Sequence, residues 1–261
     1  MSDMVLRSDT DGIATLTLND PDTLNSLSDA MLAALSRALA DIAESDARVV
    51  ILRAEGNAFC AGHNLREMQA MRQAEDGGGA RFADLFDRCA AVMAQITQLP
   101  QPVIAQVHAL ATAAGCQLVA TCDMAVAAES ARFGVNGVNI GLFCSTPMVA
   151  LTRNIPRKHA MEMLTTGTFI DAARAAGLGL VNRAVPDGAL EEETRALAAT
   201  VASKLSRAVR IGKGAFHAQA DLPVAEAYAL ARDAMVANLS EADTAEGIQA
   251  FLEKRAPGWT Q

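Results

Sequence analysis

The first half of the chain carries the alternation and the short apolar runs that are typical of β-strands. Residues 13–18 alternate between two faces, with Leu16 and Leu18 on the apolar one. Together with residues 5–7 and the turn Thr10-Asp11-Gly12, they predict an N-terminal hairpin. Further apolar runs predict strands at 49–52, 102–107, 124–128 and 132–135.

Apolar residues at helical spacing follow these strands. After a cap at Ser28 or Asp29, apolar side chains recur every three or four residues as far as Ile42 and predict a helix. Other helices are predicted at 65–73, 80–99, 114–120, 157–165, 171–176, 190–205, 208–220, 224–239 and 241–255, with one further strand at 180–185. This order predicts a mixed α/β core over residues 1–195. A helical C-terminal region over 196–261 is expected to pack on the core or on a neighbouring subunit.

Composition narrows the functional classes. The chain has 261 residues, of which 51% are hydrophobic and 20% charged, a balance typical of a well-packed globular protein. With 22 basic and 30 acidic residues the net charge is −8, which is opposite to that of a protein binding nucleic acid or an anionic membrane surface. The apolar stretch 102–122 is interrupted by polar residues, so no membrane helix is expected.

The cysteines and the N-terminus lead to a prediction of cellular location. Five cysteines, an odd number without a C-x-x-C pair, favour reduced thiols. Residues 1–10 contain early acids and no apolar segment of signal-peptide length, so we predict a cytoplasmic protein. We expect no metal site, because the chain has no metal-ligand spacing, and no dinucleotide cofactor, because it has no dinucleotide fingerprint.

Two loops rich in small residues are candidates for binding an oxyanion. In Cys60-Ala-Gly-His-Asn-Leu65, Gly62 permits a sharp turn that directs the His63 N–H outward just before a helix. In Leu110-Ala-Thr-Ala-Ala-Gly-Cys-Gln117, Ala114 begins the next helix. Two fixed N–H donors at helix N-termini stabilise the oxyanion that develops on a thioester carbonyl. Each loop alone also fits tight helix packing.

Three stretches in this order resemble the signatures of the enoyl-CoA hydratase/isomerase, or crotonase, superfamily. They are Asn57-Ala-Phe-Cys-Ala-Gly-His-Asn-Leu-Arg-Glu-Met68, residues 102–123 and residues 246–255. The stretch 111–120 together with 141–147 is similar to the subgroup called enoyl-CoA hydratase domain-containing protein 3. The resemblance implies a spiral of repeated ββα units and a helical C-terminal region that builds a homotrimer, commonly stacked into a hexamer.

The resemblance also implies a ligand and the residues that bind it. The ligand is an acyl-CoA whose thioester oxygen lies between the N–H groups of His63 and Ala114; CoA is part of the substrate, so no separate cofactor is expected. Residues matching the family's CoA-binding positions are Asn64, Leu65 and Arg66, and, from an adjoining subunit, Phe251 and Lys254. Because the protein is acidic, its phosphate contacts must come from individual cations, with Lys213 as a further candidate.

Both carboxylates of a typical family hydratase are missing. Their positions match Gln117 and Gly137, and neither residue accepts a proton at neutral pH. We therefore expect poor hydration of a 2-enoyl-CoA, improved by glutamate at both positions if the pocket is otherwise intact. The alternatives are an isomerase, decarboxylase or thioesterase reaction with a different base, or a non-catalytic acyl-CoA-binding protein.

Several other residues are candidates for the base that replaces the missing carboxylates. The His63 side chain has a suitable unperturbed pKa, although it can equally support the helix that follows. We interpret His108 as a structural histidine and Asp123 as part of a strand junction. Cys144 and Ser145 have no neighbouring base in the sequence to activate them. The acidic residues Glu67, Asp84 and Asp87 fit solvated helix faces.

Overall fold

The computed structural model describes residues 3–260, whose strands form two sheets. The larger sheet has the order β1 (Val5–Thr10), β2 (Ile13–Leu18), β3 (Val49–Ala54), β5 (Val103–Val107), β7 (Met124–Ala128) and β10 (Arg183–Val185). The smaller sheet has the order β4 (Ala58–Cys60), β6 (Leu110–Thr112), β8 (Arg132–Gly134) and β9 (Ile170–Asp171). The predicted hairpin is confirmed as the antiparallel pair β1–β2, and the rest of the larger sheet is parallel.

Eleven α-helices complete the described part of the chain. They are α1 (Asp29–Ala43), α2 (Leu65–Met71), α3 (Gly79–Gln98), α4 (Ala114–Thr121), α5 (Pro147–Asn154), α6 (Arg157–Thr166), α7 (Ala172–Leu178), α8 (Leu190–Ala202), α9 (Ser206–Gln219), α10 (Val224–Leu239) and α11 (Ala242–Leu252). In α1, the Ser28 hydroxyl accepts a hydrogen bond from the Met31 N–H, and the predicted apolar face is buried from Met31 to Ile42.

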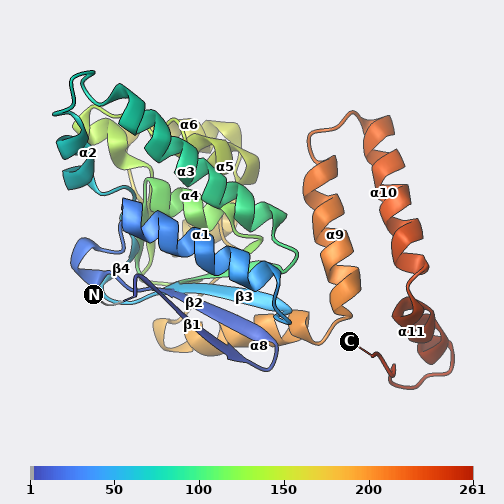
Figure 1. Ribbon diagram of the computed structural model, residues 1–261. Helices are drawn as coiled ribbons and strands as arrows, with labels where there is room; N and C mark the ends of the chain where they lie inside the picture. The colour runs from blue at the N-terminus through green and yellow to red at the C-terminus, as the bar shows by residue number, and fades with distance from the viewer. Residues whose placement is uncertain (1–2, 261) are drawn as a thin grey trace.

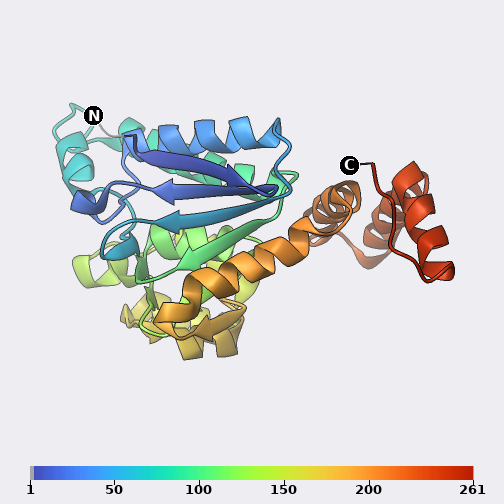
Figure 2. The ribbon, with the colours of Figure 1, turned by 90° about the horizontal axis from the view of Figure 1, so that it is seen from below.

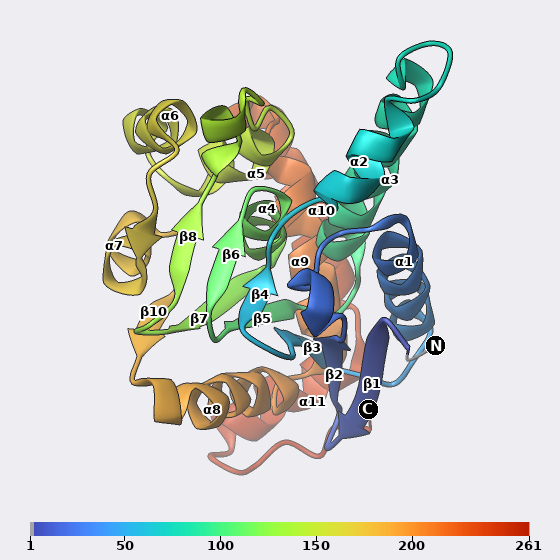
Figure 3. The same cartoon turned by 90° about the vertical axis from the view of Figure 1, so that its left-hand side faces the viewer.

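The repeating unit is a pair of strands followed by a helix. The strands β3, β5 and β7 each lie in the larger sheet, and the strand that follows each one lies in the smaller sheet. Figure 3 shows β4, β6 and β8 side by side, with α4 next to them. This arrangement is the expected succession of ββα units, and it places the end of each short strand at one edge of the smaller sheet.

Several short elements differ from the prediction. Residues 58–60 and 110–112, expected in loops, form β4 and β6, while α5 and β9 were not predicted at all. The strand predicted at 180–185 is limited to β10. Strands of two or three residues, here rich in Ala and Cys, are too short to show an alternation of polar and apolar positions.

The C-terminal helices lie beside the core. Helix α8 covers the larger sheet, with Leu190 and Ala198 packed against Val49 and Ile104. Helices α9, α10 and α11 extend to one side (Figures 1 and 2), and many of their large apolar side chains are exposed, among them Tyr228, Met235 and Phe251. No helix within residues 3–260 has the length and apolar character needed to cross a membrane. The division between residues 195 and 196 stays a prediction.

Candidate active site

The smaller sheet brings the two candidate loops together. Strands β4 and β6 are parallel neighbours, with Ala58 opposite Leu110 and Cys60 opposite Ala111. Because parallel neighbours end at the same edge of a sheet, the chain leaves both strands side by side and enters α2 and α4 there. Residues that are about 50 positions apart in the sequence therefore share one corner of the fold.

Two glycines allow these loops to touch. Gly62 has φ +89°, and a Cβ atom built on it would lie 3.2 Å from the Ala114 nitrogen and 2.9 Å from Ala113 Cβ. A Cβ atom on Gly115 would lie only 2.1 Å from the Cys60 carbonyl oxygen. The backbone preceding His63 thus lies against the first turn of α4, and any side chain at either glycine would separate the two segments.

The two predicted N–H donors flank this contact. Ala113 has φ +50° and ψ −120°, a conformation that L residues rarely adopt, and its N–H donates to the Gly134 carbonyl. Ala114 is the first residue of α4, so its N–H has no partner within the helix. Within residues 3–260, neither the Ala114 N–H nor the His63 N–H donates a backbone hydrogen bond. Both amides therefore lack a backbone acceptor among the described residues.

The His63 side chain is held from one side only. Its Nδ1 lies 3.3 Å from the Leu27 carbonyl oxygen, and its ring meets the Phe86 ring edge-on at a centroid distance of 5.5 Å. Its Nε2 is buried without a hydrogen-bond partner among the described residues. Burial lowers the pKa of the imidazole below its usual 6.5, and the Arg88 charge lowers it further, while the Leu27 carbonyl opposes both. The ring is therefore neutral at pH 7.

The two positions that lack carboxylates have different surroundings. The Gln117 side chain projects from α4, its residue is 6% exposed, and its Oε1 has no partner in the described structure. Gly137 lies in a 3₁₀ helix, Asn136–Ile140, where a Cβ atom would be 2.2 Å from the Leu142 carbonyl oxygen and 2.9 Å from Cys144 Sγ. Glutamate at Gly137 therefore does not meet the condition that the pocket stays otherwise intact, since that backbone leaves no space for a side chain.

The residues predicted to bind CoA fall into two separate groups. The Asn64 side chain caps α2 by accepting from the Arg66 and Glu67 N–H groups. Leu65, at the start of α2, is 54% exposed, and Arg66 is exposed as well. Phe251 is 81% exposed on α11. Helices α2 and α11 lie at opposite sides of the molecule in Figure 1, so a single chain does not bring the two groups together.

Other histidines, acids and thiols near the loops are already engaged. His108 Nε2 lies 2.9 Å from the Gly56 carbonyl oxygen, in keeping with a structural role. Glu67 accepts from the Asp29 N–H. Burial raises the pKa of the Cys60 and Cys116 thiols to about 12, so both keep their protons at neutral pH.

Asp123 and Lys213 form a buried link between the core and α9. Lys213 Nζ lies 2.6 Å from Asp123 Oδ2 and also donates to the Ile96 and Gln101 carbonyls. The other Asp123 oxygen lies 3.0 Å from His217 Nε2. Asp123 is structural, as interpreted from the sequence. Lys213 is buried and fully engaged, so its assignment as a phosphate-binding cation is wrong.

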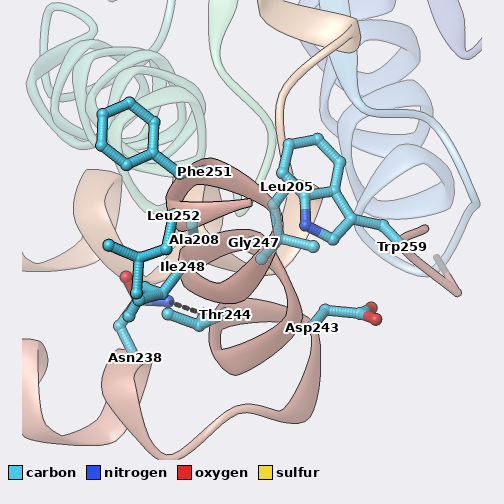
Figure 4. A pocket seen from close by; sticks show the side chains of 10 residues that line it. All are labelled: Leu205, Ala208, Asn238, Asp243, Thr244, Gly247, Ile248, Phe251, Leu252 and Trp259. Atoms are coloured by element: carbon cyan, nitrogen blue, oxygen red, sulfur yellow. Dashed lines mark hydrogen bonds between the residues drawn. The ribbon is translucent and has the colours of Figure 1, made fainter. Parts of the chain in front are cut away.

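Two cavities lie away from these loops. One of about 360 Å³ lies among the C-terminal helices, where Figure 4 shows the mostly apolar side chains of α9 and α11 together with Trp259 around it. Another of about 160 Å³ includes His159 and Arg174, on α6 and α7. Neither contains a residue of the two loops. Within residues 3–260, no three His, Cys, Asp or Glu side chains are grouped as metal ligands.

Comparison with known proteins gives the family. The profile of the enoyl-CoA hydratase/isomerase family matches residues 8–261. The human mitochondrial enoyl-CoA hydratase domain-containing protein 3 is 47% identical over 96% of this chain and 81% of its own length. The resemblance to that subgroup is confirmed. The prediction of a cytoplasmic location is wrong, because the proteins of this subgroup from five vertebrates are all named as mitochondrial.

Solved structures agree with this assignment. The crystal structure of an enoyl-CoA hydratase from Mycobacterium smegmatis is 50% identical over 99% of both chains, with a TM-score of 0.95. The crystal structure of human enoyl-CoA hydratase domain-containing protein 3 is 45% identical over 98% of this chain and 100% of that one, with a TM-score of 0.91. The two loops, the repeated ββα units and these matches over nearly the whole chain together show that the protein belongs to the enoyl-CoA hydratase/isomerase family and has the crotonase fold.

Proposed function

We propose that the chain binds an acyl-CoA and holds its thioester oxygen between the N–H groups of His63 and Ala114. The observation that supports this proposal is the close approach of Gly62, the residue before His63, to the Ala114 nitrogen, together with the lack of a backbone acceptor for the His63 and Ala114 N–H groups among the described residues. The Ala114 N–H also lies at the N-terminus of α4, where the helix dipole favours negative charge. The arrangement suits an oxygen that gains charge during the reaction, as in an enolate.

The reaction is the nominal one of the family, addition of water to a 2-enoyl-CoA, at a low rate. Hydration needs a group that activates water and a group that delivers a proton to the α-carbon. Gln117 has an amide and Gly137 has no side chain, so neither residue can take up or release a proton at neutral pH. The same two donors serve an isomerase, a decarboxylase or a thioesterase, which need other bases, and they serve a protein that binds acyl-CoA without converting it.

The binding of CoA is assigned to two subunits of a homotrimer, or of a hexamer made from two trimers. The first turn of α2, with Asn64, Leu65 and Arg66, would contact the adenine and pantetheine of the ligand. Phe251 of α11 and Lys254, in the turn after α11, would reach it from an adjoining subunit. Support comes from their exposure and from their separation within one chain, together with the many apolar side chains exposed on α9–α11.

Removing one donor tests the proposal directly. Ala114→Pro deletes the Ala114 N–H at the first position of α4, where no intrahelical hydrogen bond is lost. Proline also restricts the residue before it, and Ala113 has φ +50°, so the fold of the variant must be verified before its turnover is compared. Ala242→Pro, at the first position of α11 after the extended Glu241, is the control for proline at a helix start. We expect Ala114→Pro to lose about 10²-fold or more in turnover of any thioester the wild type converts, with no loss in the control.

The measurement is mass spectrometry of a panel of CoA thioesters, with calorimetry for binding and circular dichroism to establish that both variants fold. Conversion of any thioester shows an enzyme and identifies its reaction. Binding without conversion shows an acyl-CoA-binding protein. A folded Ala114→Pro variant that binds and converts thioesters as the wild type does would refute the two-donor site.

A further inference from the structure

The His63 imidazole is a base whose lone pair is not used by the described structure. Of the buried side-chain polar atoms without a hydrogen-bond partner there, Nε2 of His63 is the one that accepts a proton at neutral pH; the others are amide oxygens, an arginine Nε and the indole nitrogen of Trp259. A buried acceptor left without a partner costs about 1–3 kcal/mol. A ligand or a ligand's proton that meets Nε2 would remove this cost.

The Leu27 carbonyl fixes which nitrogen carries the proton. A carbonyl oxygen only accepts, so at 3.3 Å from Nδ1 it holds a neutral ring with the hydrogen on Nδ1 and the lone pair on Nε2. The same carbonyl stabilises the ring after a proton arrives at Nε2. This is the arrangement of a general base with an orienting partner, in which a backbone carbonyl serves as that partner.

The other groups near the loops do not compete for this role. The thiols of Cys60 and Cys116 stay protonated, His108 is bonded to the Gly56 carbonyl, and Gln117 has no basic group. The imidazole belongs to the same residue as one of the two proposed donors. A thioester oxygen bound by the His63 N–H would therefore lie at the residue that also carries this base.

We propose that His63 Nε2 removes the proton from the carbon next to the thioester carbonyl. The inference rests on the proposed acyl-CoA function. The proton passes to Nε2, and the electron pair of the C–H bond forms a double bond to the carbonyl carbon. The carbonyl π pair moves to the oxygen, which the His63 and Ala114 N–H groups hold as an enolate. Return of a proton from Nε2 restores the thioester.

Charged groups around the ring come from three helices. Arg88 on α3 opposes protonation of the ring and pairs with Asp84 of the same helix and Asp29 of α1. Glu67 on α2 accepts from the Asp29 N–H. The two carboxylates bound to Arg88 offset its charge, which leaves burial as the first cause that keeps the ring neutral. Exchange of the substrate proton should therefore be constant at neutral pH and fall as the pH drops below 6.5.

Deuterium incorporation isolates this step from the rest of any reaction. Butyryl-CoA has no double bond to hydrate, so incubation with the protein in D₂O reports removal of the α-proton alone, as a mass increase. His63→Asn keeps a side-chain N–H at the Nδ1 position for the Leu27 carbonyl but removes the base, and His63→Ala removes both. His159→Gln, an exposed histidine on α6, is the matched control.

We expect the wild type and His159→Gln to incorporate deuterium. His63→Asn should lose about 10²-fold or more in that rate while binding butyryl-CoA as the wild type does. A merely structural His63 would be rescued by asparagine and would give no fall in rate below pH 6.5. A wild type that binds butyryl-CoA without incorporating deuterium, or a His63→Asn variant that incorporates it as fast, overturns the inference alone. A wild type that binds no acyl-CoA refutes the proposed function and this inference with it.

Discussion

Substitution of Gly115 by alanine tests the contact between the two loops. Gly115 lies inside α4, where alanine in place of glycine ordinarily stabilises a helix by about 0.5–1 kcal/mol. Here the added Cβ atom would lie 2.1 Å from the Cys60 carbonyl oxygen, 2.7 Å from its carbon and 2.8 Å from Cys60 Cβ. Real Cβ contacts essentially never fall below 3.0 Å, so β4 and α4 must move apart by about 1 Å.

The displacement costs more than the helix gains. The closest atom belongs to the backbone of a buried strand, so it cannot rotate away as a flexible side chain does. Overpacking a well-packed interior costs about 1–3 kcal/mol, and occasionally more. A backbone clash belongs at the upper end of that range, so we expect Gly115→Ala to lower the free energy of unfolding by about 2 kcal/mol after the helix gain is subtracted.

The assay is urea denaturation at one protein concentration, with Gly212→Ala as the control. Gly212 lies in α9, and a Cβ atom there would meet nothing within 4 Å. The control should gain about 0.5–1 kcal/mol from helix propensity alone. Because the contact also sets the spacing of the His63 and Ala114 amides, thioester turnover or binding should fall in Gly115→Ala and not in the control. Equal stabilisation of both variants would show that the loops do not meet as described.

Three further predictions concern the site and its support. Gln117→Glu should raise the hydration rate of crotonyl-CoA, measured by mass spectrometry, because it adds a carboxylate at nearly constant volume. Gly137→Glu should instead lower the free energy of unfolding, because the Leu142 carbonyl and the Cys144 thiol block its side chain. An unchanged rate in Gln117→Glu, or an unchanged stability in Gly137→Glu, would contradict this. Lys213→Met should cost about 3 kcal/mol in chemical denaturation, because it leaves the Asp123 carboxylate buried with less compensation; a neutral effect would argue against the link. Folding lowers the pKa of His63, so the unfolded chain binds the proton more readily than the folded one. The stability of the wild type relative to His63→Gln should therefore be constant above pH 7 and fall as the pH drops below 6.5. A pH-independent difference would contradict a buried neutral ring.

Much of the secondary structure follows from local sequence. The hairpin, α1 with its Ser28 cap, the strand β7 and the helices α8–α10 all carry either a clear alternation or a helical period together with an end signal. Such patterns arise because each helix or strand buries one of its faces, so apolar residues recur with the period of that element. The two glycine loops and the order of the family motifs were likewise visible along the chain, and the family followed from them.

Tertiary structure decided what the short segments do. That Cys60 and Ala111 are partners in neighbouring strands depends on pairing across 50 residues, and three-residue strands carry no pattern of their own. The sequence equally did not show which side chains already have partners in the folded chain. From the sequence, Lys213 is a candidate cation for phosphate, but in the fold it is buried against Asp123. Gly137 is a position that lacks the family carboxylate, and only the fold shows that the Leu142 carbonyl leaves no space there for a side chain. His63 can support the helix that follows it, and only the fold shows that its Nε2 has no hydrogen-bond partner among the described residues. A sequence specifies which groups are present, but their availability depends on the neighbours that the fold brings to them.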